Sequence, residues 1–200
     1  MIHLYMTRHG ITKWNTEHRL QGSQNSPLTD EGIQNAKKLH EIYKDIPFSH
    51  CFSSPLPRAV HTTLLLIGDR GIPLFPDAKL QEIDLGSWEG LKIETVERDF
   101  PEEFLSFWKY PEKFYPKTGE SFHQVVERAA FFLEKIKNLP DGSVALIVTH
   151  GIILQALVMI CEGRNIETLR EGERFSQTST THITYDKNAW NILKKNKKIS

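Results

Sequence analysis

Two histidines stand in the same local setting in this 200-residue chain. His9 follows one apolar run and precedes Gly10, and His150 follows another and precedes Gly151. A single histidine is more often a hydrogen-bonded structural residue than a catalyst. A histidine at the end of a buried strand, beside a glycine that lets a ligand approach the backbone, can act as a nucleophile or carry a proton. The repeated pattern therefore favours a catalytic role for both histidines over a structural one.

Two arginines accompany these histidines, and each could hold an anion. Arg8 directly precedes His9, and Arg58 falls in the first turn of a predicted helix. The positive end of the helix dipole disfavours a cation there, so Arg58 needs an anionic partner, either a carboxylate or a phosphate. A guanidinium suits phosphate because its planar fork donates two parallel hydrogen bonds. The helix predicted after His150 offers free N–H groups to the same anion.

A third segment carries carboxylates among glycines. Glu82, Asp84 and Glu89 lie close together, with Gly86 and Gly90 between and after them, and no helical period is evident. Taken alone, the segment is a loop whose acids are more often solvated than catalytic.

The elements that must position these residues alternate between strands and helices. Short apolar runs predict strands at residues 2–6, 48–52 and 143–149, and a closing hairpin at residues 180–185 and 190–193 around the turn 186–188. The run at 143–149 is continuously apolar, as in a parallel strand buried on both faces. We therefore expect a mainly parallel sheet with helices on both faces, and a site at the carboxyl ends of its strands.

Capping residues mark where the helices begin. Thr29 is expected to cap one helix, and Ser121 with Gln124 forms a capping box for another. Ser54 is expected to cap a third, with Pro55 in its first turn. A fourth helix is predicted at residues 152–160. The basic tail 194–200 is expected to fray.

Composition restricts the classes of function. The chain has 25 basic and 25 acidic side chains, and this zero net charge argues against a nucleic-acid or membrane partner. We see no secretory signal and no apolar stretch long enough to span a bilayer. The two cysteines, Cys51 and Cys161, suit a reducing compartment. We expect one cytoplasmic domain covering residues 1–200.

Taken together, the motifs resemble the histidine phosphatase superfamily, which includes the cofactor-dependent phosphoglycerate mutases. The likeness runs from Met1 to about Ile160 and is closest to the small broad-specificity phosphatases. It rests on Arg8-His9-Gly10 with Thr12 and Asn15, Arg19-Leu20-Gln21-Gly22, Ser53-Ser54 with Arg58-Ala59, Glu82 with Gly86 and Trp88-Glu89-Gly90, and Thr149-His150-Gly151.

The resemblance implies a fold and a set of roles. The fold is a three-layer α/β/α sandwich around a six-stranded, mainly parallel mixed sheet. His9 would be the nucleophile that becomes phosphohistidine, and Glu82 the general acid. The phosphate would be held by Arg8, Arg58 and His150, with Asn15, Gln21, Gly22 and Gly151 completing the pocket. The expected substrate is a small phosphomonoester, without a metal or cofactor. A mutase and a non-catalytic phosphate-binding protein are the alternatives.

An aromatic segment at residues 100–115 follows the acidic loop. It lies within a helical insertion that we place at about 91–120. We expect this insertion to pack on the sheet at its base and to face the substrate at its tip, as a lid. Packing alone is the simpler interpretation.

Overall fold

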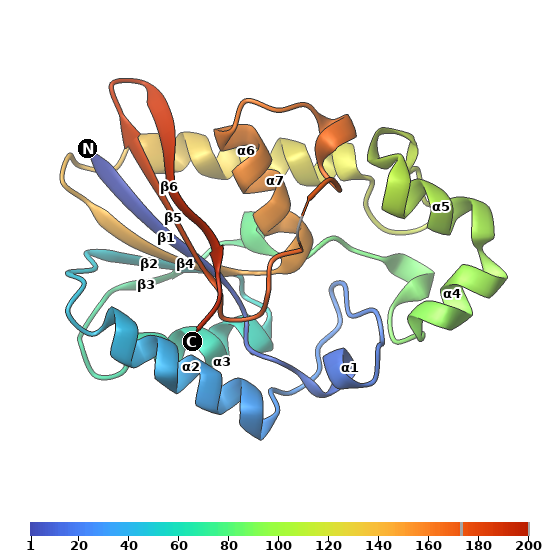
Figure 1. The fold of residues 1–200 in the computed structure, drawn as a ribbon, viewed down its shortest axis with the longest axis horizontal. Coiled ribbons are helices and arrows are strands. Elements are labelled where there is room, and N and C mark those ends of the chain that lie inside the picture. The colour runs from blue at the N-terminus through green and yellow to red at the C-terminus, as the bar shows by residue number, and fades with distance from the viewer. Residues whose placement is uncertain (173, 200) are drawn as a thin grey trace.

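A computed structural model describes residues 1–172 and 174–199 and contains one six-stranded sheet between two helical layers (Figure 1). The strand order is β3-β2-β4-β1-β5-β6. The strands are β1 (Ile2–Arg8), β2 (His50–Ser53), β3 (Leu74–Pro76), β4 (Val144–Thr149), β5 (Thr180–Asp186) and β6 (Ala189–Lys197).

Four neighbouring strands of the sheet run parallel. β1 pairs with β4, β4 with β2, and β2 with β3, all in parallel, whereas β5 and β6 form the antiparallel hairpin. In this register Arg8 lies opposite Thr149, and Ser53 lies opposite Val148. The residues that follow β1, β2 and β4 therefore leave the sheet at one edge. The expected α/β class and the mainly parallel mixed sheet are confirmed.

Helices cover both faces of the sheet. The helix α2 (Asp30–Tyr43) packs against α3 (Pro57–Ile67) on one face, and α6 (Phe122–Lys137) packs against α7 (Gly151–Cys161) on the other (Figure 1). Two apolar clusters fill the spaces between the layers; Leu39 and Leu66 belong to one, and Phe132 and Leu154 to the other. The remaining helices are α1 (Lys13–Thr16), α4 (Ile93–Asp99) and α5 (Pro101–Lys109).

Two of the three predicted helix caps are confirmed, and the third is wrong. The Thr29 hydroxyl accepts from the Gly32 N–H, and Ser121 forms the capping box with Gln124. Ser54 does not cap α3, which begins after Leu56 with Pro57 as its first residue. Pro57 has no N–H to satisfy and its φ already suits a helix, so the start shifts past Pro55.

The strand bounds differ from the prediction at the edges of the sheet. The short edge strand β3 was not predicted, and β6 continues to Lys197, so the expected fraying at 194–197 is wrong. The end of that predicted tail, Ser200, lies outside the described residues. No helix in the described part of the chain is long and apolar enough to cross a membrane.

The region of the expected lid contains α4, α5 and a short 3-10 turn at Pro111–Lys113. The side chains of Phe107 and Phe114 are buried and contact Trp88, whereas Tyr110 and Tyr115 are exposed. The aromatic segment is thus partly an extension of the core.

Candidate active site

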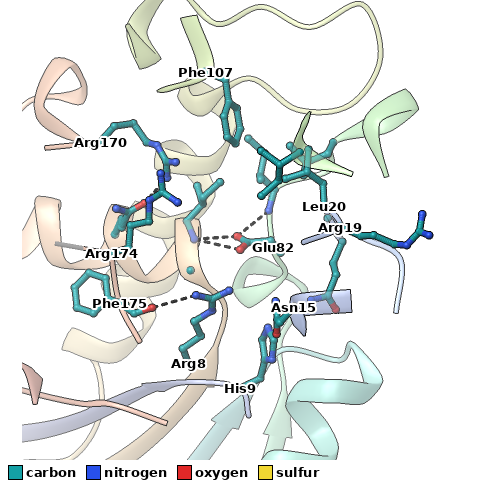
Figure 2. Close-up of a pocket in the computed structure, with 18 of the residues that line it drawn as sticks. Arg8, His9, Asn15, Arg19, Leu20, Glu82, Phe107, Arg170, Arg174 and Phe175 are labelled. Atoms are coloured by element: carbon teal, nitrogen blue, oxygen red, sulfur yellow. Dashed lines mark hydrogen bonds between the residues drawn. The ribbon is translucent and has the colours of Figure 1, made fainter. Parts of the chain in front are cut away.

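A cavity opens beside the carboxyl ends of β1 and β4 and the start of α7. Figure 2 shows His9 and Arg8 on one side of it, Glu82 at its centre, and Arg170 with Arg174 on another side. The wall includes the predicted residues Asn15, Gln21, Gly22, Arg58 and Gly151. His150, the remaining predicted residue, is fully buried and lies behind His9.

The imidazole of His9 is held in one tautomer. Its Nδ1 lies 2.7 Å from the Gly10 carbonyl oxygen. A carbonyl only accepts, so Nδ1 carries the proton and Nε2 keeps its lone pair. Nε2 accepts from Arg58 Nε at 3.3 Å. Burial, followed by the charges of Arg58 and Arg8, holds the pKa of His9 well below its usual value. His9 is therefore a neutral imidazole with a lone pair near two cations.

Arg58 is almost completely buried and is fixed by carbonyl groups. Its two terminal nitrogens donate to the carbonyl oxygens of Gln24 at 2.6 Å and Gly22 at 2.7 Å. Burial lowers its pKa to about 10, while the charge of Glu82 acts in the opposite direction. The sequence left either a carboxylate or a phosphate as the anionic partner of Arg58. Because Arg58 forms no ion pair with a carboxylate of the described residues, a phosphate is the favoured partner.

Arg8 is oriented by the C-terminal part of the chain. One terminal nitrogen donates to the Phe175 carbonyl oxygen at 3.1 Å (Figure 2). Its Nε is buried and has no hydrogen-bond partner among the described residues. Burial lowers the pKa of Arg8, and the Glu82 charge opposes that shift. A donor of this kind is available to an anion in the cavity.

His150 lies next to His9 but is not part of the cavity wall. The ring centroids of the two histidines are 5.1 Å apart. His150 Nε2 lies 2.7 Å from the Ser54 hydroxyl, which explains why Ser54 is buried at the end of β2 instead of capping α3. Burial, followed by the charge of Arg58, holds the pKa of His150 well below its usual value.

Glu82 occupies the start of α7, where the sequence suggested an exogenous anion. Its carboxylate accepts from the N–H groups of Ile152 at 3.1 Å and Ile153 at 3.3 Å. The predicted free N–H groups of this helix are therefore partly used by the protein itself. A Cβ on Gly151 would lie 3.6 Å from Glu82 Oε2 and 3.5 Å from Arg8 Cζ. Glycine leaves both groups room at the cavity wall.

The other two acids of the loop have structural partners. Glu89 accepts from the Ser23 N–H at 2.6 Å and from the Gln24 N–H at 3.1 Å, and thus holds the loop whose carbonyls bind Arg58. Asp84 accepts from the Gly86 N–H at 2.8 Å. Neither lines the cavity, whereas Glu82 does.

Two amide side chains form the remaining wall. The Asn15 side chain accepts from the Thr12 N–H and hydroxyl, completing a capping box on α1. Gln21 donates from Nε2 to the Thr12 hydroxyl at 2.8 Å, and its Oε1 is buried without a partner among the described residues. Thr12 thus fixes both amides at the cavity.

Comparison of the chain with known proteins identifies its family. A model of the histidine phosphatase superfamily, branch 1, matches residues 4–198. The chain belongs to this superfamily. A curated relative from Shigella boydii, named as a probable phosphoglycerate mutase, GpmB, is 31% identical over 196 residues, which cover 95% of this chain and 88% of the relative.

Solved structures of other proteins share the whole fold. YhfR from Bacillus stearothermophilus is 34% identical, with a TM-score of 0.95 over 100% of this chain and 98% of that chain. The alpha-ribazole phosphatase from Shigella flexneri is 26% identical, with a TM-score of 0.88 over 99% of this chain and 98% of that chain. This chain is therefore similar both to a named mutase and to a named phosphatase.

Several residues at the cavity of this superfamily member were not singled out from the sequence. They include Gln155, Arg170, Arg174 and Phe175. Phe107 and Trp108 also line the cavity. The aromatic pair belonged to the predicted lid. Arg170 and Arg174 lie in an irregular segment after α7, and a basic residue without periodicity or a glycine beside it gives little signal.

The buried histidines of this superfamily member predict a loss of stability in acid. The pKa values of His9 and His150 are lowered mainly by burial, and burial lowers that of His182 to about 4. Unfolded histidines take up protons near pH 6.5, so the unfolded state binds more protons below that value. We expect the Tm of the apo protein to fall between pH 7 and pH 5, by about 2–4 °C per kcal/mol for a chain of this size.

Differential scanning calorimetry across this range tests the expectation. His182→Gln should flatten the slope, whereas His61→Gln, at an exposed histidine, should leave it unchanged. A Tm that is constant or rises towards pH 5 would contradict the assignment of neutral buried histidines.

Proposed function

We propose that this protein hydrolyses small phosphomonoesters through a phosphohistidine intermediate on His9. The observation that carries the proposal is the fixed tautomer of His9, whose unprotonated Nε2 lies at the cavity beside the guanidinium of Arg58. A neutral imidazole with an unprotonated ring nitrogen at a cavity is a competent nucleophile near neutral pH. The two buried free cysteines agree with action in the cytoplasm.

In the first step, His9 Nε2 forms a bond to phosphorus while the bond from phosphorus to the ester oxygen breaks. Phosphoryl transfer requires in-line positioning and stabilisation of charge on the equatorial oxygens. Arg8 and Arg58 would provide that charge, with Asn15, Gln21 and the backbone at Gly22 and Gly151 completing the pocket. His150 would contribute from behind His9. Glu82 would give its proton to the leaving oxygen.

In the second step, Glu82 would accept a proton from water as the water oxygen attacks phosphorus. The bond from phosphorus to His9 Nε2 breaks, and inorganic phosphate leaves. Support for Glu82 in both roles comes from its place at the cavity between Arg8 and the start of α7. Asp84 and Glu89 have other partners.

A phosphoglycerate mutase is the second candidate, favoured by the named relative from Shigella boydii. The same chemistry becomes a mutase when the product is retained and rephosphorylated. Only 67 residues separate Glu82 from His150. The resemblance implies a longer insertion at this point in the cofactor-dependent mutases, and the short span therefore supports a phosphatase. Incubation with 3-phosphoglycerate separates the two: we expect free phosphate, and 2-phosphoglycerate would identify a mutase. No turnover of any ester would favour a phosphate-binding protein.

We expect activity to be independent of metal ions. Arg8 and Arg58 supply the positive charge that a metal would otherwise bring to the phosphate. Prolonged treatment with a chelator should leave kcat unchanged, and vanadate should inhibit by occupying the anion pocket. Loss of activity on chelation, with recovery on adding a divalent ion, would contradict this expectation.

A further inference from the structure

The cavity wall carries more positive charge than phosphoryl transfer uses. Its arginines are Arg8, Arg19, Arg58, Arg170 and Arg174, whereas Glu82 is the one carboxylate among its described residues. Arg19 pairs with Glu17 at 2.7 Å. Within the described part of the chain, Arg170 and Arg174 form no ion pair with a carboxylate. Two of the cavity's cations thus have no assigned partner.

Arg170 is held by one hydrogen bond and by aromatic rings, and no described carboxylate forms an ion pair with it. One terminal nitrogen donates to Gln155 Oε1 at 2.6 Å, and the guanidinium lies 4.3 Å from the ring centroid of Trp108 and 5.1 Å from that of Phe107. Its Nε is buried and has no acceptor among the described residues. Burial, followed by the charge of Arg174, lowers the pKa of Arg170 to about 9. An anion beside it would relieve this cost.

Arg174 lies on the same aromatic ring but is exposed. Its guanidinium is 4.1 Å from the Trp108 ring centroid. The tryptophan thus brings two like charges together at the cavity, although they repel each other. Cation–π contacts use the faces of the guanidinium groups and leave N–H donors at their edges free for an anion.

The position of this pair matches the far end of a bound ester. Figure 2 shows Arg170 and Arg174 beside Glu82, above Arg8 and farther from His9. In the proposed reaction, Glu82 protonates the leaving oxygen, so the leaving group would extend from Glu82 towards the arginine pair. Trp108, Arg174 and Ile93 also line a second groove outside the cavity.

We propose that Arg170 and Arg174 bind a second anionic group of the substrate, a carboxylate or a second phosphate on the leaving group. This inference rests on the proposed function and narrows its substrate class to small esters that are acidic at both ends. Phe107 and Trp108 of the insertion then serve to position the two arginines at the cavity.

Two esters of similar size test whether Arg170 and Arg174 bind a second anionic group. We would measure kcat/KM for 3-phosphoglycerate and for glycerol 3-phosphate, which carries a hydroxymethyl group in place of the carboxylate. The wild type should prefer 3-phosphoglycerate. Arg174→Gln should lower kcat/KM for 3-phosphoglycerate about 10-fold or more, the scale of one lost charge-assisted hydrogen bond. It should change the value for glycerol 3-phosphate less than about twofold. Propane-1,3-diol bisphosphate would distinguish a phosphate from a carboxylate as the second group.

Two further variants act as controls. Arg174→Lys keeps the charge and should recover part of the preference. Arg98→Gln removes the same charge from an exposed arginine that pairs with Asp99, and should leave both values unchanged.

Equal losses on both esters with Arg174→Gln would overturn the inference, as would a wild-type preference for glycerol 3-phosphate. If the wild type turned over neither ester, the proposed function would fail separately. Calorimetric binding of 3-phosphoglycerate and glycerol 3-phosphate to the wild type and Arg174→Gln would then decide the subsite: it stands if only 3-phosphoglycerate loses affinity, and falls otherwise.

Discussion

Replacing His9 by alanine is expected to reduce kcat/KM by at least about 10⁴-fold, because removal of a covalent nucleophile leaves only binding and electrostatic stabilisation. The fold should survive. The His9 side chain contacts the Gly10 carbonyl and Arg58 at the cavity, and its burial as a neutral imidazole is itself unfavourable in acid. Steady-state rates with p-nitrophenyl phosphate and the Tm of the variant provide the two readouts.

His61→Ala is the matched control for this substitution, because His61 is an exposed histidine on α3. It should retain wild-type activity and stability. An active His9→Ala variant would exclude His9 as the nucleophile. A variant that is inactive but unfolded would be replaced by His9→Gln, which keeps a polar side chain beside Arg58.

Replacing Glu82 by glutamine should affect esters according to their leaving groups. An alkoxide must be protonated as its bond to phosphorus breaks, whereas a nitrophenolate departs almost unaided. A positioned general acid contributes about 10²–10⁴-fold. We therefore expect a loss of that size in kcat/KM on glycerol 3-phosphate and a distinctly smaller loss on p-nitrophenyl phosphate. Glutamine can still accept from the Ile152 and Ile153 N–H groups through its amide oxygen.

The neighbouring acids provide the comparison for Glu82. Glu89→Gln should weaken the loop that binds Arg58 and reduce the rates on both esters alike. Asp84→Asn should show no dependence on the leaving group. Equal losses on both esters for Glu82→Gln would refute its role, and a leaving-group effect in either neighbour would reassign it.

Much of the fold could be predicted because its signals are local. The continuous apolar run of β4 and the Ser121 capping box are properties of adjacent residues. β3 escaped prediction because it is three residues long, lies at the sheet edge and ends in proline. The start of α3 was misplaced because Pro55 and Pro57 both suit a first turn.

The residues of the site likewise fall into those with a local signal in the sequence and those that depend on contacts in the folded chain. Arg8, His9 and His150 adjoin predicted strands, so the parallel topology alone brings them together. That Glu82 caps α7 depends on a contact over 70 residues of sequence, which no local pattern encodes. Arg170 and Arg174 reach the cavity through the ring of Trp108, and that contact also exists only in the folded chain.

Trapping the phosphoenzyme tests the central claim most directly. Wild-type protein would be mixed with ³²P-labelled ester, quenched within the first turnovers, and digested for peptide mapping. The account predicts acid-labile, alkali-stable phosphate on the peptide that contains His9, and none in His9→Ala. Acid-stable phosphate on a serine, label on the His150 peptide, or turnover through no phosphoenzyme at all would contradict it.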